Sequence, residues 1–142
     1  MRGCVHMNDE RLAAQVPKLR FPHFRDAPAW RAFGGDELFD QVNERNGNGE
    51  LPVLAITQEH GAIPRQLIDY HVSVSEQSLE TYKVVNPGDF IISLRSFQGG
   101  IEYSSYRGIC SPAYVVLRPR LDVVDEYFKH YFKTDEFIRL LT

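Results

Sequence analysis

Two polar segments of this 142-residue chain carry side chains that suit recognition through directed hydrogen bonds. Arginine offers a planar fork of donors that fits a phosphate or a guanine edge, and amide and hydroxyl groups add further donors and acceptors. The first segment supplies Thr57, Gln58, His60 and Arg65. The second supplies Arg95, Ser96, Gln98, Gly99, Tyr103, Ser105, Tyr106 and Arg107. We therefore expect these two segments to form one binding surface.

The distribution of charge singles out the second segment. The formal net charge of −3 by itself argues against a nucleic-acid-binding domain, because such domains are often basic. Residues 83–120, however, carry five Lys or Arg side chains against two acidic ones, and four of those five cations are arginines. Residues 31–82 carry three basic and nine acidic side chains. Positive charge is therefore gathered around residues 95–107.

The sequence holds no pattern typical of a catalytic or metal centre. A nucleophile elbow, a phosphate-binding loop and a dinucleotide-binding glycine motif do not occur, and the five histidines lack metal-ligand spacing. Asn86–Phe90 is similar to the Asn-Pro-Pro-Phe motif of DNA amino-methyltransferases, but Gly88 and Asp89 fit a tight turn instead. Cys4 and Cys110 are too few for a disulfide framework, and Cys110 is expected to be a small, partly buried thiol. The sequence favours a binding module over an enzyme.

Short apolar runs predict the strands that must hold the two polar segments. They cover residues 52–57, 82–85, 90–94 and 113–117. The sequence Asn86–Asp89 has Pro second and Gly third, which predicts a type II turn and makes residues 82–94 a hairpin. Residues 36–42 predict a short helix and 75–81 a helical turn. Residues 58–65 are expected to be a loop, and residues 95–108 a long loop or an irregular hairpin.

The two ends of the chain differ from this middle part. Three prolines within residues 16–29 predict an extended arm, and Phe21, Phe24 and Trp30 are expected to pin that arm onto a core. Near the other end, Asp122 is a good N-cap for a helix with a broad apolar stripe. The sequence Thr134–Glu136 predicts a second helix start. Neither end contains the roughly 20 apolar residues of a membrane helix.

Ordered blocks along the chain resemble the specificity (S) subunit of type I restriction–modification enzymes. The blocks are Val16–Phe24 with Trp30, Val53–Thr57, Gly61–Arg65, Tyr82–Arg95, Gly99–Ile101 with Ser104, Gly108–Leu117 and Tyr127–Thr134. Their common order and spacing make the resemblance specific. It covers residues 16–142, whereas residues 1–15 are expected to form a flexible polar leader. With the predicted elements, it indicates an α+β fold with a twisted, mostly antiparallel sheet, long loops and a few short helices, as in that family's target recognition domain.

The resemblance implies a function without catalysis. In that family the S subunit carries two target recognition domains separated by long helices, and each domain reads one half of a split double-stranded DNA target. The S subunit holds modification subunits, which bind S-adenosylmethionine and methylate adenine, and restriction subunits join them. This chain lacks the second domain, the long helices and the usual end of the first domain. We therefore expect one amino-terminal recognition domain, truncated at its C-terminal end, cytoplasmic, with no membrane contact, metal or cofactor of its own.

Within this reading, Arg95, Gln98 and Arg107 are the leading base or phosphate contacts. Residues Gly99 and Gly100 would let the backbone approach the duplex closely. Arg65 and Gln58 would reach the DNA from the neighbouring segment. Structural roles remain open for Arg95, which follows a strand, and for Tyr103 and Tyr106, which could pack against the core.

Two other functions remain open. The chain could be a protein-interaction fragment whose terminal aromatic helix docks a DNA methyltransferase subunit without appreciable DNA binding. It could also be an enzyme that methylates DNA itself. Salt-sensitive DNA binding separates the first alternative from a DNA reader, and binding of S-adenosylmethionine identifies the second.

Overall fold

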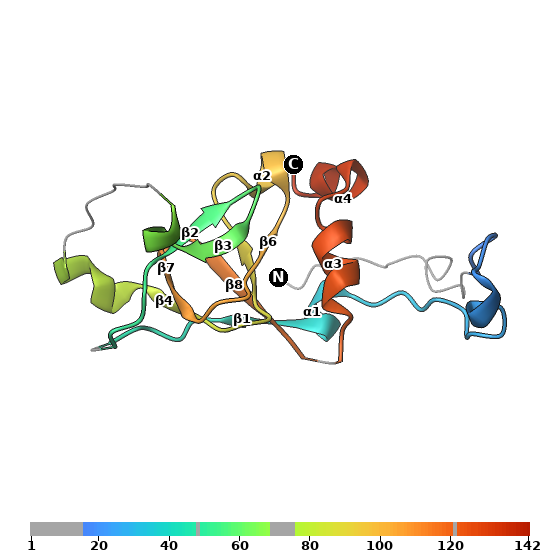
Figure 1. The fold of residues 1–142 in the computed structure, drawn as a ribbon, viewed down its shortest axis with the longest axis horizontal. Helices are drawn as coiled ribbons and strands as arrows, with labels where there is room; N and C mark the ends of the chain where they lie inside the picture. Colours follow the sequence, from blue (N-terminus) through green and yellow to red (C-terminus); the bar gives the residue numbers. More distant parts are fainter. Residues whose placement is uncertain (1–15, 48, 69–75, 121) are drawn as a thin grey trace, which may run out of the picture. The chain divides into compact units, whose positions relative to one another are not determined.

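The computed structural model describes residues 16–47, 49–68, 76–120 and 122–142 (Figure 1). The chain divides into two compact units, Met1–Glu37 and Leu38–Thr142. Residues 16–37 thus belong to a unit of their own, whereas the sequence suggested one domain over residues 16–142. The expected polar leader, residues 1–15, lies outside the described residues.

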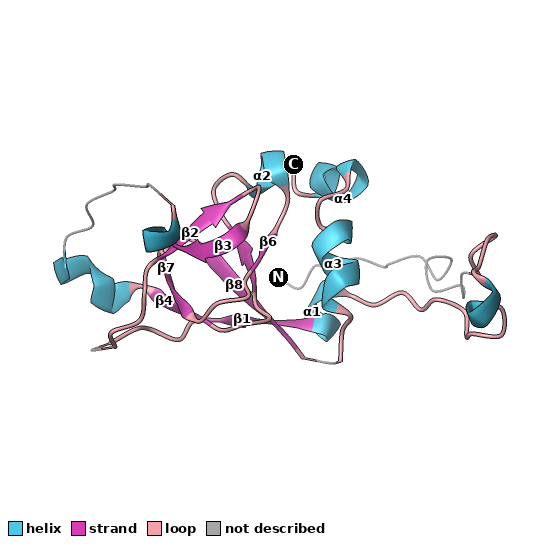
Figure 2. Cartoon of the chain, in the orientation of Figure 1, coloured by secondary structure: helices cyan, strands magenta, loops and turns pink. Residues whose placement is uncertain are grey.

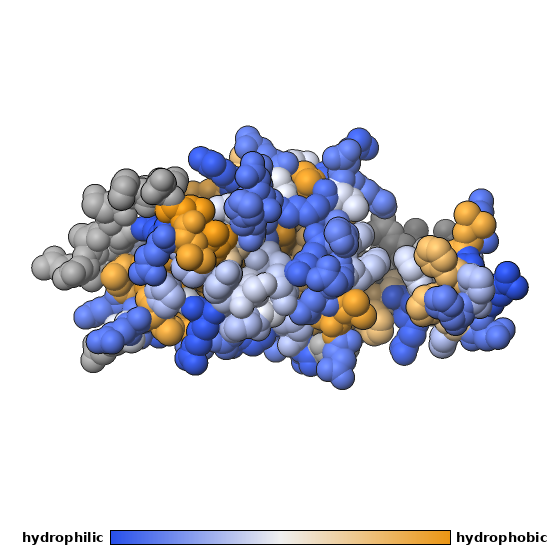
Figure 3. Space-filling model, in the orientation of Figure 1, coloured by the Kyte–Doolittle hydropathy of each residue, from blue (hydrophilic) through white to orange (hydrophobic). Residues whose placement is uncertain are grey.

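The described part of the first unit is organised around one arginine. Arg20 donates from Nη1 to the carbonyl of Phe24 at 3.2 Å and from Nη2 to that of Pro28 at 2.8 Å, across a 3-10 helix at Pro22–Phe24. These hydrogen bonds fold the segment back on itself. The aromatic side chains of the segment remain exposed. Phe21, Phe24 and Trp30 are 76%, 55% and 57% exposed, and apolar atoms appear on the surface of this unit (Figure 3). The rings are therefore not buried within their own unit, and the prediction that they pin residues 16–29 onto a core stays a prediction.

The second unit holds the strands of the described chain, coloured in Figure 2. They are β1 (Phe39–Val42), β2 (Leu54–Thr57), β3 (Gly61–Pro64), β4 (Lys83–Val85), β5 (Phe90–Ile92), β6 (Glu102–Tyr103), β7 (Gly108–Cys110) and β8 (Val115–Pro119). The helices are α1 (Gly35–Leu38), α2 (Ser96–Gly99), α3 (Asp125–Tyr131) and α4 (Asp135–Leu140), with 3-10 turns at Arg65–Leu67 and Glu76–Thr81. The predicted helical turn at residues 75–81 is confirmed from Glu76 onward.

Every pairing between these strands is antiparallel. Four strands form a sheet in the order β1-β8-β5-β6, while β2 pairs with β3 and β4 pairs with β7. Isolated parallel bridges, Val53 with Ile109 and Ala62 with Ser104, link the smaller sheets to their neighbours. The predicted α+β class with mostly antiparallel sheet is therefore confirmed.

The turn at residues 86–89 forms as predicted, but it does not close a hairpin. The N–H of Asp89 donates to the carbonyl of Asn86 at 3.0 Å, and Gly88 has φ +97°. The strands on either side join different sheets, because β4 pairs with β7 and β5 with β8 and β6. The residues of the turn therefore determine that the chain turns here. Which strands β4 and β5 pair with depends on segments distant in sequence.

Residues 36–42 also differ from the prediction. Only Gly35–Leu38 is helical, and Phe39–Val42 forms the edge strand β1. Its register on β8 sets Phe39 opposite Pro119 and Val42 opposite Val116. Phe39 is buried there against Phe90 and Phe128. Burial in this aromatic cluster, together with pairing to β8, outweighs the local helical tendency.

Two apolar clusters form the core of the second unit. The first lies between the small sheets and β5 and β8, and includes Leu54, Val85 and Ile91. The second collects Phe90 and Phe132 under α3 and α4, which stand together beside the sheet in Figure 1. The apolar stripe predicted near the C-terminus thus faces the core through Phe128, Tyr131 and Phe132, whereas Val124 and Tyr127 are exposed.

The two terminal helices begin differently. Helix α3 starts at Asp125 after Val124, which gives no side-chain cap, so Asp122 is not the N-cap that was predicted. Helix α4 does begin as predicted, because Thr134 Oγ1 accepts the N–H of Phe137 at 3.2 Å. Neither these nor the other helices of the described residues are long and apolar enough to cross a membrane.

Candidate functional site

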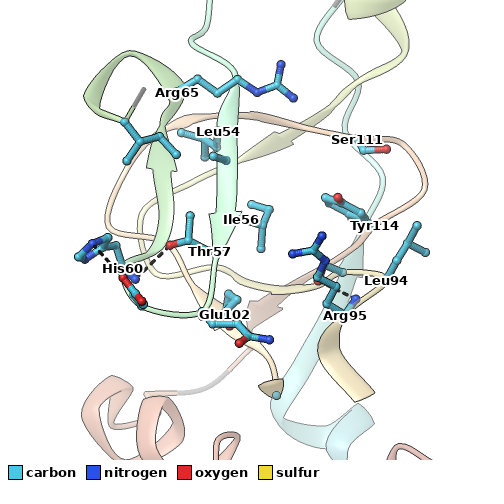
Figure 4. A pocket seen from close by; sticks show the side chains of 16 residues that line it. Leu54, Ile56, Thr57, His60, Arg65, Leu94, Arg95, Glu102, Ser111 and Tyr114 are labelled. Atoms are coloured by element: carbon cyan, nitrogen blue, oxygen red, sulfur yellow. Dashed lines mark hydrogen bonds and ion pairs between the residues drawn. The ribbon is translucent and has the colours of Figure 1, made fainter. Parts of the chain in front are cut away.

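A surface hollow of about 700 Å³ lies between the β2–β3 hairpin and the segments around Arg95 and Tyr114 (Figure 4). Apolar side chains of β2, Leu54 and Ile56, form part of its wall, and polar side chains stand around them. The hollow brings together five residues of the predicted binding surface: Thr57, Gln58, His60, Arg65 and Arg95. Two segments that are distant in sequence therefore share one site.

The hairpin side of the hollow is shaped by Thr57. Its Oγ1 donates to the carbonyl of Gly61 at 2.9 Å and accepts the N–H of His60 at 3.0 Å. Gly61 has φ +68°, as the left-handed position closing a three-residue hairpin loop requires. Thr57 is therefore engaged in the turn, while Gln58 and His60 are exposed at its tip. Residues 58–65 were expected to be a loop, but Gly61–Pro64 forms β3.

The opposite side is set by a small serine network. The N–H of Ser93 donates to Ser96 Oγ at 2.9 Å, and the N–H of Arg95 donates to Ser93 Oγ at 3.2 Å. Ser96 is 2% exposed, so it supports the turn and does not offer itself to a ligand. The Arg95 side chain is exposed and lies beside Tyr114 in Figure 4.

Two glycines that were predicted to let the backbone approach DNA lie close to other segments of the domain. A Cβ on Gly99 would lie 2.3 Å from Nε2 of Gln58, so Gly99 makes room for that side chain. A Cβ on Gly100 would lie 2.1 Å from the carbonyl oxygen of Phe132, and Gly100 has φ +81°. Gly100 thus lies against the backbone of Phe132, while the approach of these glycines to a duplex stays a prediction.

The strand β6 closes the hollow and is fastened to α3 and the residues after it. Glu102 lines the hollow, is 4% exposed and forms an ion pair with Lys133. Burial raises the pKa of the Glu102 carboxyl above its ordinary value, and Lys133 opposes this only in part. The neighbouring Tyr103 donates its hydroxyl to Asp125 Oδ2 at 2.7 Å.

Tyr103 therefore has a role within the domain. Its ring packs on Phe90, and Lys129 Nζ lies 4.4 Å from the ring centroid. Burial and the bond to Asp125 raise the pKa of the Tyr103 hydroxyl to about 12. The side chain was predicted to contact DNA, but both its ring and its hydroxyl are engaged in holding α3 against β6.

The remaining predicted residues do not line the hollow. Gln98 is exposed on α2. Ser105, Tyr106 and Arg107 are exposed before β7, whereas Ser111, which does line the hollow, follows β7. The length of β7 thus lies between these three residues and Ser111, and each residue of an extended strand advances the chain by about 3.3 Å.

Two residues of the hollow, Ser111 and Tyr114, were not selected from the sequence. Tyr114 lies within residues 113–117, which were predicted only as an apolar strand, and it packs against the first cluster. Its backbone is held by Lys83, which is 5% exposed and donates from Nζ to the Tyr114 carbonyl at 2.6 Å. The neighbouring sequence does not indicate that Lys83 is buried. It also does not indicate that Tyr114, whose backbone Lys83 holds, belongs to the site.

The described residues contain no group of three or more His, Cys, Asp or Glu that could hold a metal ion. Cys110 is 1% exposed, and burial raises the pKa of its thiol to about 12, so the thiolate needed for nucleophilic attack is suppressed. The cysteine was predicted to be a partly buried thiol, and the structure buries it more completely than that.

The charges around the hollow are mixed. Arg65 and Arg95 contribute positive charge, and Glu59 at the hairpin tip is 3.8 Å from His60 Nε2. The second carboxylate of the lining, Glu102, is paired with Lys133. The arrangement suits hydrogen-bonded recognition of a polar, planar ligand, with apolar contact from β2.

Comparison with known proteins found no match to a family model, a curated protein or a solved structure.

Proposed function

We propose that this chain is a non-catalytic domain that reads a short sequence of double-stranded DNA. The observation that carries the proposal is the hollow, which unites Gln58 and His60 with Arg95. These residues are of the types that read base edges, and the sheets beneath them supply a rigid support. The resemblance in sequence supports the more specific proposal of a target recognition domain in a type I restriction–modification specificity subunit.

In such a complex the chain would read one half of a bipartite target. Modification subunits would supply S-adenosylmethionine and adenine methylation, and a restriction subunit would complete the assembly. This reading assigns the domain to the cytoplasm and leaves it without catalytic residues of its own.

One isolated reader is expected to bind weakly. A good bidentate contact to a base is worth ~1–3 kcal/mol, and contacts to phosphate weaken as the salt concentration rises. In the assembled complex, a second recognition domain and the clamping subunits would raise the affinity through avidity. Binding experiments on the isolated chain therefore belong at low salt.

The test is selection from a randomised duplex library with the 142-residue chain at low salt, followed by sequencing of the retained DNA. Enrichment of a word of about three to five bases is expected. Uniform retention that vanishes with added salt would contradict sequence reading, and no retention at any salt would contradict DNA binding altogether. Arg95→Ala is expected to weaken retention without loss of the cooperative thermal transition.

A second candidate function is docking of a DNA methyltransferase subunit without appreciable DNA binding. Phe97 on α2 and Leu140 on α4 favour it, because they are 50% and 73% exposed on helices that contact each other. Against it, the aromatic rings of α3 pack mainly into the core. Co-purification with a modification subunit that Phe97→Ser and Leu140→Ser together abolish would support this second function.

A further inference from the structure

The basic segment, residues 83–120, contains four arginines, and two of them are bound within the domain. Arg118 donates from Nε and Nη2 to the carboxylate of Asp89 at 2.9 and 2.8 Å. Arg120 Nε lies 3.5 Å from Asp40 Oδ1. Arg107 precedes β7 and does not line the hollow. Of these four arginines, Arg95 alone combines exposure with a place in the hollow.

The guanidinium of Arg95 makes no hydrogen bond or ion pair with any residue that the structure describes. The other arginine of the hollow, Arg65, is only partly exposed and already interacts within the chain. A free, exposed guanidinium retains all five of its N–H donors for a ligand. Arg95 is therefore the side chain of the hollow best able to make a new bidentate contact.

The backbone that carries Arg95 is held in place. Ser96 Oγ accepts the N–H of Ser93, Ser93 Oγ accepts the N–H of Arg95, and the N–H of Ser96 donates to the Ser93 carbonyl at 3.2 Å. Gly100, four residues after Ser96, is fixed against Phe132. A side chain on such a support loses less conformational freedom on binding, which favours a specific contact over a loose electrostatic one.

We propose that Arg95 is the specificity-determining residue of the site and reads a guanine in the major groove. The inference rests on the proposed function and deepens it. Guanine presents two acceptors, N7 and O6, at the spacing of the guanidinium fork, and this pair is the commonest specific contact of arginine with DNA. Ile56, the partly exposed apolar side chain of β2 in the wall of the hollow, would lie against the adjoining bases, where apolar side chains meet the thymine methyl group.

A phosphate contact by Arg95 is the competing assignment, and it predicts different behaviour. Lysine can replace arginine at a phosphate, because a point charge suffices there, but it does not reproduce the bidentate fork. Loss of a phosphate contact weakens all duplexes alike and lowers the salt slope by about one. Loss of a guanine contact relaxes the preference at one position of the enriched word.

The experiment repeats the duplex selection with Arg95→Gln, Arg95→Lys and, as a charge-matched control, Arg120→Gln. Arg120 belongs to the same basic segment but lies beyond the far end of β8 from Tyr114. In the wild-type chain we expect one guanine preferred over other bases by about 5- to 150-fold. Arg95→Gln should shift that position toward adenine, since glutamine pairs with adenine N6 and N7. Arg120→Gln should keep the guanine.

A chemical probe tests the same contact on the unchanged protein. Replacing the selected guanine with 7-deazaguanine removes the N7 acceptor but keeps O6, so binding should weaken by less than a wrong base at that position causes. The variant Arg95→Ala should then bind the normal and the deaza duplex equally. Retention of the cooperative thermal transition in each variant shows that the fold is intact.

The possible failures are distinguishable. If the wild-type chain enriches no word, the proposed function fails and the assignment of Arg95 fails with it. If a word is enriched but Arg95→Gln and Arg95→Lys keep the same base preferences, the domain reads DNA and Arg95 is not its guanine reader. The same conclusion follows if 7-deazaguanine changes nothing.

Discussion

Asp89 and Arg118 form a two-point ion pair, with Nε 2.9 Å from Oδ1 and Nη2 2.8 Å from Oδ2. Asp89 is 1% exposed, and its Oδ2 also accepts the N–H of Asn86 at 2.8 Å. The pair fastens the turn that follows β4 to strand β8. A single carboxylate thus closes the turn and fixes where the chain passes from one sheet to the next.

Replacing Arg118 with Gln should lower the free energy of unfolding by about 3 kcal/mol, the lower end of the range for breaking a buried pair, because the Asp89 carboxylate would remain buried without its cation. The lower end applies because the Arg118 side chain is itself 32% exposed. Urea denaturation measures the change. Arg120→Gln, which disturbs the exposed pair with Asp40, should cost less than about 1 kcal/mol. If both variants lost the same free energy of unfolding, the buried Asp89–Arg118 pair would stabilise the fold no more than the exposed Asp40–Arg120 pair does.

Gly100→Ala should destabilise the domain more than Gly88→Ala. Both glycines have positive φ, +81° and +97°, so either substitution strains the backbone by about 1–2 kcal/mol. Only at Gly100 does the added Cβ also meet a carbonyl oxygen, that of Phe132 at 2.1 Å, whereas nothing lies within 4 Å at Gly88. Thermal unfolding of the two variants gives the comparison. A smaller shift in Gly100→Ala would contradict the close approach between this glycine and α3.

The titration of the Glu102 carboxyl group should lower the free energy of unfolding as the pH rises. Burial raises its folded-state pKa above the ordinary 4.5, so the folded chain holds the proton more tightly than the unfolded chain does. The free energy of unfolding therefore loses this contribution as the pH rises from about 4.5 through the raised pKa. Glu102→Gln removes the titration, and its stability relative to the wild type should improve between pH 4 and pH 7. A relative stability that falls over this range would mean that Lys133 lowers the pKa of Glu102 overall.

Cys110 should react with a thiol reagent only when the domain opens. The side chain is 1% exposed, and its pKa is raised to about 12, so little accessible thiolate exists at pH 8. In a Cys4→Ser background, Cys110 is the single thiol of the chain. Labelling with an aromatic disulfide reagent should be slow in buffer and fast in urea. Rapid labelling in buffer would show that β7 is open to solvent.

Local chemistry in the sequence predicts some of the fold. The turn at Asn86–Asp89, the N-cap at Thr134 and strand β2 follow from residues within a few positions of one another. Pairing partners do not, because the choice of β7 or β5 as the neighbour of β4 depends on contacts across the whole domain. The misassignment of Phe39–Val42 as helix has the same origin, since its pairing with β8 joins residues about 80 positions apart.

The candidate site could be predicted only in part. The polar character of Thr57, Gln58, His60, Arg65 and Arg95 was visible, and the structure does bring these residues to one hollow. The roles of Ser96, Gly99 and Tyr103 were not visible, because each depends on a partner distant in sequence or on a turn geometry: Ser93, Gln58 and Asp125. Residue type alone does not distinguish a side chain that holds a site together from one that faces a ligand.

The most direct test of the central claim is an NMR titration of the isotope-labelled chain with the duplex word obtained by selection. The account predicts that amide shifts concentrate in Thr57–His60, Ser93–Arg95, Ser111 and Tyr114, which line the hollow. Shifts concentrated instead in Ser105–Arg107 or in residues 16–37, with the hollow unchanged, would contradict the account.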